Sequence, residues 1–168
     1  MSAPVDIEIR EADFSLGEEY EALRRRAPQA GACVVFTGLV RGEGGLGALD
    51  ALELEHYPGM AEASIAAVIE RARARWPVLA VRVIHRVGHI RGGEQIVLVG
   101  VASAHRAEAF AAAEFLMDYL KTEAPIWKKE LGPAGERWVE CRARDTEAAA
   151  RWSRLTDAQT STHSPEKP

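Results

Sequence analysis

Long hydrophobic runs and disulfide-forming cysteines are what this sequence lacks. No apolar stretch approaches the roughly 20 residues that a helix needs to cross a bilayer. The first residues, 1–4, have neither the basic nor the apolar region of a signal peptide. Cys33 and Cys141 are the only cysteines in 168 residues, a length at which a core forms without disulfide bonds. These absences predict a soluble protein of the reducing cytosol.

A strong overall charge is also missing. The net charge is −4, so the chain has no positive field that would attract nucleic acid or an anionic membrane, and any basic site must be local. Neither cysteine predicts a Cys/His nucleophile pair. Cys33 lies in an apolar segment without a neighbouring base, and Cys141 is flanked by Glu140 and Arg142.

Hydrophobic periodicity predicts one α+β domain over residues 1–152, with a mostly antiparallel sheet and its helices on one side. Strands are predicted at 5–9, 31–41, 52–57, 80–87, 95–102 and 138–141. Helices are predicted at 15–26, 61–76, from 103 or 105 to 121, and at 146–154, with a short helical turn at 127–129 after Pro125. Residues 153–168 are polar and predict a disordered tail.

Three glycines fit the spacing of a dinucleotide-binding loop. Gly42, Gly44 and Gly47 match G-x-G-x-x-G directly after a predicted strand. That fingerprint needs a helix to follow, so that the helix N-terminus meets the pyrophosphate. Here the next segment alternates with a period of two, which favours a hairpin loop between two strands.

Two histidines are spaced as metal ligands on a helix would be. His85 and His89 are separated by four positions, but this segment is predicted as strand and turn, where such residues lie too far apart to share a metal easily. No third ligand stands at a convincing spacing. We interpret both as core or strand-end histidines and expect neither a metal nor another cofactor.

Positively charged residues gather at the ends of several predicted elements. Each of them has an ordinary explanation as a solvated or dipole-satisfying surface residue. Aromatic residues near them could wall a pocket in which lysine loses solvent, and this favours a site for a small anion. The residues concerned are Arg41, His105, Arg106, Lys121, Lys128 and Lys129, with Phe115, Tyr119 and Trp127 as the aromatic neighbours.

At these positions the chain resembles the large catalytic subunit of molybdopterin synthase. The resemblance covers roughly residues 5–152, in order and at that family's spacing. It departs from the family at Leu39, where a lysine is common, and in the glycine-rich loop 42–47, which is usually polar. The matching strings are 35–38 with Arg41, then 54–60, 83–88, 99–106, 117–122 and 125–130.

This resemblance implies an α/β-hammerhead fold with a small antiparallel β subdomain. It also implies a homodimer within a heterotetramer, in which each protomer binds one small ubiquitin-like sulfur-carrier subunit. Two sulfur atoms would pass from the carrier's C-terminal Gly-Gly thiocarboxylate to cyclic pyranopterin monophosphate and form the dithiolene of molybdopterin. The chain itself would then need no nucleophilic cysteine.

The resemblance further implies the roles of particular residues. Lys121 and Lys128 are the expected catalytic residues, and Arg142 is a weaker candidate for a contribution across subunits. The residues expected to bind substrate are Leu39, Val40, Arg41, His105, Arg106, Lys121, Lys128, Lys129 and Glu130.

One predicted helix carries expected site residues at both of its ends. At about 1.5 Å per residue, the backbones of His105 and Lys121 are separated by roughly 24 Å, too far to hold one small phosphate. We therefore expect each site to take residues from both protomers of a dimer. Two rival hypotheses are a non-catalytic module that binds an acidic C-terminal tail and a metal-dependent hydrolase built on the histidines.

Overall fold

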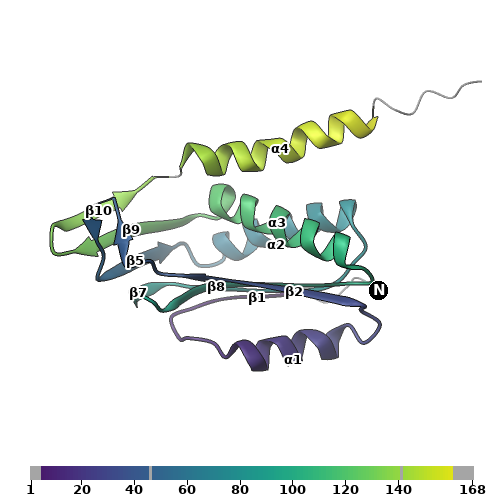
Figure 1. Cartoon of the computed structure of the whole chain (residues 1–168), viewed down its shortest axis with the longest axis horizontal. Coiled ribbons are helices and arrows are strands. Elements are labelled where there is room, and N and C mark those ends of the chain that lie inside the picture. The colour runs from purple at the N-terminus through teal and green to yellow at the C-terminus, as the bar shows by residue number, and fades with distance from the viewer. Residues whose placement is uncertain (1–4, 46, 141, 161–168) are drawn as a thin grey trace, which may run out of the picture.

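Two β-sheets lie end to end in the computed structural model, which describes residues 5–45, 47–140 and 142–160 (Figure 1). The larger sheet has the strand order β1-β6-β8-β2, in which β1 pairs in parallel with β6 and the other neighbours are antiparallel. Its strands are β1 (Val5–Arg10), β6 (Val78–Arg86), β8 (Gln95–Ser103) and β2 (Ala32–Leu39). The predicted α+β class is confirmed.

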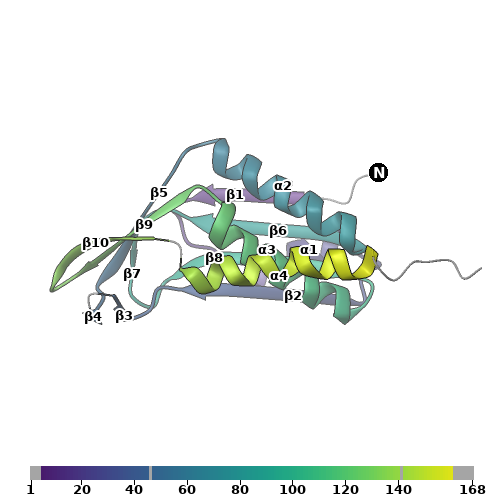
Figure 2. The same ribbon diagram turned by 90° about the horizontal axis from the view of Figure 1, so that it is seen from above.

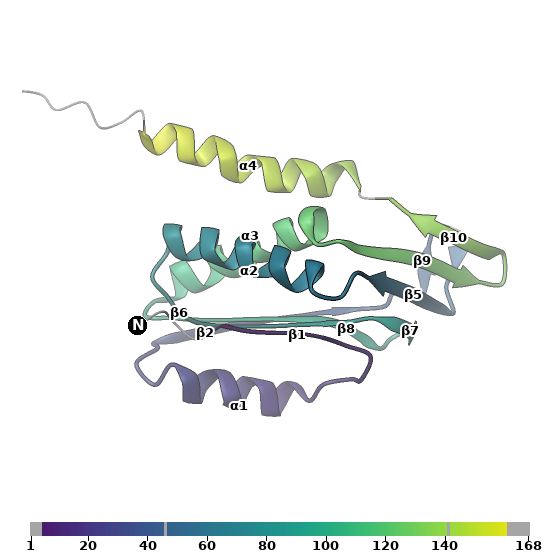
Figure 3. The same ribbon diagram turned by 180° about the vertical axis from the view of Figure 1, so that it is seen from behind.

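Helices cover both faces of this larger sheet. Helix α1 (Leu16–Arg26) lies on one face, and α2 (Met60–Arg75) and α3 (Arg106–Glu123) lie on the other, as Figures 1 and 3 show. The prediction that all helices lie on one side is therefore wrong. The sequence did not indicate that the second face of the sheet is covered, because β6 carries Arg82 on that face. This charged residue is nevertheless only 5% exposed.

The main core fills the space between the larger sheet and the helices α2 and α3. Ile65, Val68, Ile69 and Ala72 form the buried stripe of α2, as its periodicity predicted. The opposite face has a smaller core, in which Leu23 of α1 packs with alanines of β6 and β8. Helix α1 begins after Ser15, whose hydroxyl accepts a hydrogen bond from the backbone N–H of Glu18.

The smaller sheet is entirely antiparallel, with the strand order β10-β9-β5-β7. Its strands are β10 (Gly135–Val139), β9 (Ile126–Gly132), β5 (Ala51–His56) and β7 (Gly88–Arg91). A short hairpin of β3 (Glu43–Gly44) and β4 (Gly47–Ala48) precedes β5. The glycine-rich segment is thus followed by a strand, as predicted, but it does not join two paired strands, because β2 and β5 lie in different sheets. Gly88 takes a φ of 78° directly after β6 and Val87, where the chain turns from one sheet into the other.

Residues 127–129 form part of strand β9, not the helical turn that we predicted. Strand β9 pairs with both β5 and β10 along its length. Its alternation was obscured because the face turned toward the core carries Lys128 and Glu130, where a strand would ordinarily place apolar side chains.

Helix α4 (Ala143–Thr160) runs over the outside of α3 (Figures 1 and 2). The Asp118 carboxylate of α3 accepts hydrogen bonds from Arg151 and from the indole N–H of Trp152. The helix continues through 153–160, the first part of the predicted disordered tail, where the sequence contains neither proline nor glycine. Residues 161–168 and Cys141 lie outside the described residues.

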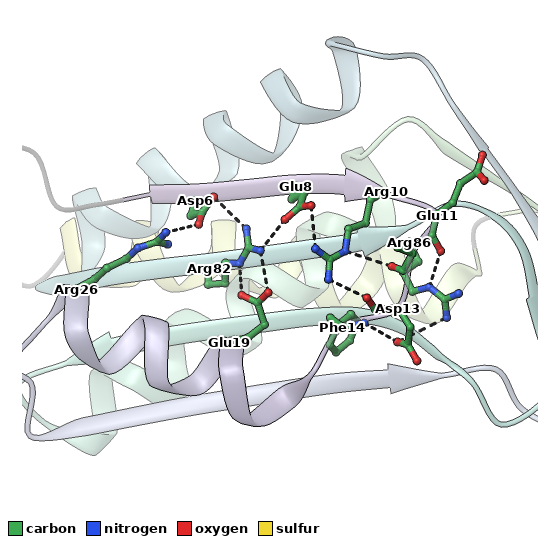
Figure 4. Close-up of polar contacts among 11 residues, drawn as sticks. Asp6, Glu8, Arg10, Glu11, Asp13, Phe14, Glu19, Arg26, Arg82 and Arg86 are labelled. Atoms are coloured by element: carbon green, nitrogen blue, oxygen red, sulfur yellow. Dashed lines mark hydrogen bonds and ion pairs between the residues drawn. The ribbon is translucent and has the colours of Figure 1, made fainter.

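A network of ion pairs joins β1, β6 and α1 on the α1 side of the larger sheet (Figure 4). The guanidinium of Arg82 donates hydrogen bonds to Glu8 at 2.7 Å and to Glu19 at 2.7 Å, and forms an ion pair with Asp6 at 3.0 Å. Three carboxylates thus offset the cost of burying one guanidinium. Nearby, the side chain of Arg86 donates to the backbone carbonyls of Glu11 and Gln95.

Candidate active site

A cavity of about 840 Å³ opens where the two sheets meet the C-terminal end of α3. Strands β2, β6 and β8 of the larger sheet and β5, β9 and β10 of the smaller sheet contribute to its wall, together with the ends of α3 and α4 that face it. Leu52, Leu54, Ile96, Val97 and Ile126 form an apolar part of this wall. The volume lies in the range of small-molecule sites.

Five positively charged side chains line this cavity, although they come from distant parts of the sequence. Arg41 follows β2, Lys121 lies in the last turn of α3, and Lys128 belongs to β9. Arg142 precedes α4, and Arg144 lies in its first turn. Lys121 also lies 3.7 Å from the carboxylate of Asp145. Such convergence of cations in a concave site is suited to holding an anion.

Lys128 is the member of this group whose chemistry the fold changes most. Burial lowers the pKa of Lys128 below its usual range, and the neighbouring charges of Arg142, Arg41 and Lys121 lower it further, while Glu130 opposes the shift. Neutral lysine is therefore available at a lower pH than in water. A lysine in this state can act as an acid or a base.

His85 also lines the cavity, opposite Val97 in the register of β6 and β8. Its Nδ1 lies 2.8 Å from the backbone carbonyl oxygen of Arg86. A carbonyl oxygen only accepts, so Nδ1 carries the proton. Burial lowers the pKa of His85 to about 4, and the nearby His56 contributes to this shift, so the ring is neutral at physiological pH. The sequence pattern predicted only a core or strand-end position for it.

The carboxylate of Glu130 binds other groups of the same chain. The side chain is only 3% exposed and accepts a hydrogen bond from the backbone N–H of Gly45 at 3.0 Å. Arg137 lies 3.9 Å from the same carboxylate. A side chain on Gly44 would collide with this carboxylate and with Leu49, which explains the glycine there. Glu130 is thus an anchor for the β3–β4 hairpin at the cavity.

Leu39 ends β2 and Val40 follows it, but only Leu39 lines the cavity. Leu39 is 55% exposed and lines the cavity. Val40 is buried beneath the hairpin in a core cluster with Leu49 and Leu52, and both of its backbone polar groups are hydrogen-bonded within the chain. Val40 therefore supports the site from behind and does not line it.

Besides Val40, three expected site residues, His105, Arg106 and Lys129, do not line this cavity within a single chain. His105 and Arg106 lie at the N-terminal end of α3, and Lys121 lies near its other end, in agreement with the helix predicted from the sequence. Lys129 faces the opposite surface of the smaller sheet from Lys128. Its ammonium lies 3.2 Å from Glu136 and 5.4 Å from the ring centre of Trp138.

Neither metal chemistry nor cysteine chemistry finds support in the described part of the chain. It contains no group of three or more histidine, cysteine, aspartate or glutamate side chains placed to hold a metal ion. Burial raises the pKa of the Cys33 thiol, which disfavours the reactive thiolate. No helix among the described residues is long and apolar enough to cross a membrane.

Comparisons with known proteins agree on one family. The family model described as MoaE protein matches residues 9–123. The chain is 53% identical to the molybdopterin synthase catalytic subunit of Ralstonia nicotianae over 151 residues, which cover 90% of this chain and 86% of that protein.

Two solved structures share the fold. The molybdopterin biosynthesis MoaE protein from Burkholderia ambifaria is 48% identical, with a TM-score of 0.77 over 89% of this chain and 98% of its own. A protein–protein complex of subunits 1 and 2 of molybdopterin-converting factor from Helicobacter pylori contains a chain with a TM-score of 0.67 and 22% identity. That match covers 81% of this chain and 91% of the other.

Proposed function

The chain belongs to the MoaE family of molybdopterin synthase catalytic subunits and so has a catalytic role in molybdenum cofactor biosynthesis, and from this premise we propose how its residues transfer sulfur. The substrate is cyclic pyranopterin monophosphate, and the sulfur donor is the C-terminal thiocarboxylate of a small ubiquitin-like carrier. Both are anions. The observation that carries this proposal is the gathering of Arg41, Lys121, Lys128 and Arg142 around one cavity.

The cations bind the two anions and Lys128 moves protons. When a thiocarboxylate gives up its sulfur, the carbonyl carbon exchanges its bond to sulfur for a bond to oxygen, so water enters and protons must be relayed. Lys128 is suited to this relay because its lowered pKa makes both of its protonation states accessible. The permanent charges of Arg41 and Arg142 hold the phosphate or the thiocarboxylate, because a guanidinium binds such groups through paired hydrogen bonds.

The carrier subunit binds with its tail in the cavity, and two copies of this chain form the core of a heterotetramer. The complex of two subunits of molybdopterin-converting factor from Helicobacter pylori supports a small partner subunit. His105 and Arg106 of the second protomer complete the site of Lys121 and Lys128, because α3 holds its two ends too far apart for one site. Lys129, which faces the opposite surface, is left out of the site.

Reconstitution of the reaction tests this proposal directly. Purified protein is mixed with thiocarboxylated carrier and cyclic pyranopterin monophosphate, and dithiolene formation is followed over time. We expect molybdopterin to form at the expense of the thiocarboxylate, with two carriers consumed per product. If the protein binds the carrier tail and yet forms no product, it is a non-catalytic module that recognises an acidic C-terminus.

A further inference from the structure

His85 is an uncharged group in a cavity that also holds cations. It lies opposite Val97 in the register of β6 and β8, and Ile96 and Val97 line the cavity with it. Arg41, Lys121 and Lys128 line the same cavity. The cavity thus combines cations with a neutral imidazole beside apolar side chains.

The protein fixes which nitrogen of His85 faces the cavity. Its Nδ1–H is committed to the carbonyl oxygen of Arg86, so Nε2 holds the lone pair. Among the described residues no hydrogen bond reaches Nε2, and this atom is not among the buried side-chain atoms that lack a partner. Nε2 is therefore open to the cavity that the ring lines. It can accept a hydrogen bond and, in the neutral ring, cannot donate one.

A purely structural role does not account for this histidine. Val81 and Val83 precede it on the same face of β6 and are fully buried in the main core, so an apolar residue would continue the pattern. The bond to Arg86 joins neighbouring residues and ties no two elements together. The acceptor at Nε2 serves no group of the described chain and is left for a donor that enters the cavity.

We propose that Nε2 of His85 accepts a hydrogen bond from an N–H group of a substrate bound in the cavity. This inference rests on the proposed function and deepens it. Two bound species could supply such a donor. One is the nitrogen-rich ring system of the precursor, whose phosphate would lie among the cations. The other is a backbone amide of the carrier's C-terminal tail. His85 would be a specificity-determining residue in either case.

A matched pair of substitutions isolates the accepting nitrogen. In His85→Asn the amide nitrogen takes the place of Nδ1 and still donates to Arg86, but nothing replaces Nε2. In His85→Gln the longer side chain places an amide oxygen near the position of Nε2 and keeps an acceptor there. His89→Asn is the control, because His89 is exposed on β7, outside the cavity, and pairs with Glu53 at 3.4 Å.

Binding is measured by calorimetry with two separate probes, the precursor and a synthetic carrier-tail peptide ending in Gly-Gly. We expect His85→Asn to weaken binding of one probe by about three- to tenfold, the usual worth of one hydrogen bond. His85→Gln and His89→Asn should stay within about twofold of the parent. Loss confined to the precursor identifies its ring as the donor, and loss confined to the peptide identifies the tail amide.

Steady-state turnover provides a second readout. A lost binding contact raises KM for the species concerned while kcat changes little, and unchanged melting temperatures show that the variants remain folded. The inference is overturned if His85→Asn binds both probes like the parent, or if His85→Gln loses as much as His85→Asn. Failure of the proposed function looks different, because the unsubstituted protein would then form no molybdopterin in the same assay.

Discussion

The side chain of Lys128 combines burial with like charge, and both influences favour its neutral form. Burial removes the water that would stabilise the ammonium, and three neighbouring cations repel it. Lys129, the next residue, points to the other surface of β9 and pairs with Glu136. Two adjacent lysines of one strand thus have different chemistry because successive side chains of a strand point in opposite directions.

Replacing Lys128 should remove most of the turnover without unfolding the protein. We expect Lys128→Ala to lower kcat by about 10²- to 10⁴-fold, the usual worth of a positioned acid or base. Lys128→Arg should be nearly as poor, because arginine keeps the charge but does not release its proton. Lys129→Ala is the matched comparison and should retain most of the activity. Full turnover in Lys128→Arg would show that only the charge matters.

The pH dependence of turnover should follow the pKa of the same lysine. If Lys128 acts as a base, kcat/KM rises as the pH rises through its pKa, which lies below the ordinary value of 10.5. The measurement is a pH profile of kcat/KM for the parent and for Arg142→Gln. Removing the Arg142 charge takes away the strongest of the repulsions, so the pH at which kcat/KM rises should move higher. If the rise of kcat/KM occurs at the same pH in both proteins, Lys128 is not the titrating group.

Glu8 provides a test of stability at the scale of one residue. Hydrogen bonds from Arg82 and then Arg10 lower the pKa of Glu8 below its ordinary value of 4.5. Its contribution to stability is therefore present above pH 4.5 and is lost as the pH falls through the lowered value. Because the Glu8 side chain is 38% exposed, we expect an effect of only about 0.5–1 kcal/mol.

Chemical unfolding at pH 7 and pH 3.5 measures this contribution. Glu8→Gln should lose less free energy of unfolding between the two pH values than the parent does. Glu21→Gln is the control, since Glu21 pairs with Arg24 on the exposed surface of α1, where both side chains are about half exposed. Equal acid sensitivity in Glu8→Gln and the parent would contradict the assignment.

At the scale of secondary-structure elements, the β3–β4 hairpin depends on one buried carboxylate. Glu130 of β9 holds the backbone of Gly45, and the hairpin in turn borders the cavity near Arg41 and Arg142. Removing the carboxylate leaves the Gly45 N–H without its partner. Gly45 itself is exposed, so the loss is that of one hydrogen bond to a charged acceptor, about 1.5–3 kcal/mol.

Hydrogen exchange at Gly45 should report the loss of this anchor. We expect Glu130→Ala to speed exchange of the Gly45 amide by at least about tenfold, which corresponds to roughly 1.4 kcal/mol of lost protection. Turnover should fall as well, because the hairpin no longer holds Arg41 in place. Glu136→Gln, on the exposed face of the neighbouring strand, should leave the Gly45 amide unchanged. Unaltered exchange in Glu130→Ala would show that the hairpin is held by other contacts.

The elements that the sequence predicted are those whose buried faces are apolar. Strand β8 and helix α2 follow ordinary periodicity, and both were predicted within a few residues of their bounds. Strand β9 was predicted as a helical turn because function places Lys128 and Glu130 on its inner face. The position of α1 was missed because its contact with the sheet is built partly from Arg82 and Glu19, which a hydrophobic pattern cannot reveal.

The candidate site was predicted only in part for a similar reason. Spacing and resemblance pointed to Arg41, Lys121 and Lys128, which the fold does bring to one cavity. They gave no reason to separate Lys129 from Lys128, since a helical turn places adjacent side chains differently from a strand. His85 was missed because a single histidine in an alternating apolar strand is more often part of the core.

For the whole molecule, the length of α3 decides how many chains a site needs. Arg106 begins this helix and Lys121 lies in its last turn. We therefore expect that Arg106→Ala and Lys121→Ala proteins, each inactive alone, regain activity when they are refolded together in equal amounts. Half of the dimers would then be mixed, each with one intact site, which gives up to about a quarter of full activity. No recovery would show that each site is built within one chain.

The same helix has a consequence for gene dosage. A chain that carries both Arg106→Ala and Lys121→Ala damages its own site and also the site of any normal chain with which it pairs. If a cell makes both kinds of chain, an intact site forms only where two normal chains meet, so activity follows about the square of the normal fraction. At equal expression about a quarter of the activity would remain, whereas sites built within single chains would leave half. The double variant should therefore be dominant over the normal gene, because one rigid helix serves two active sites.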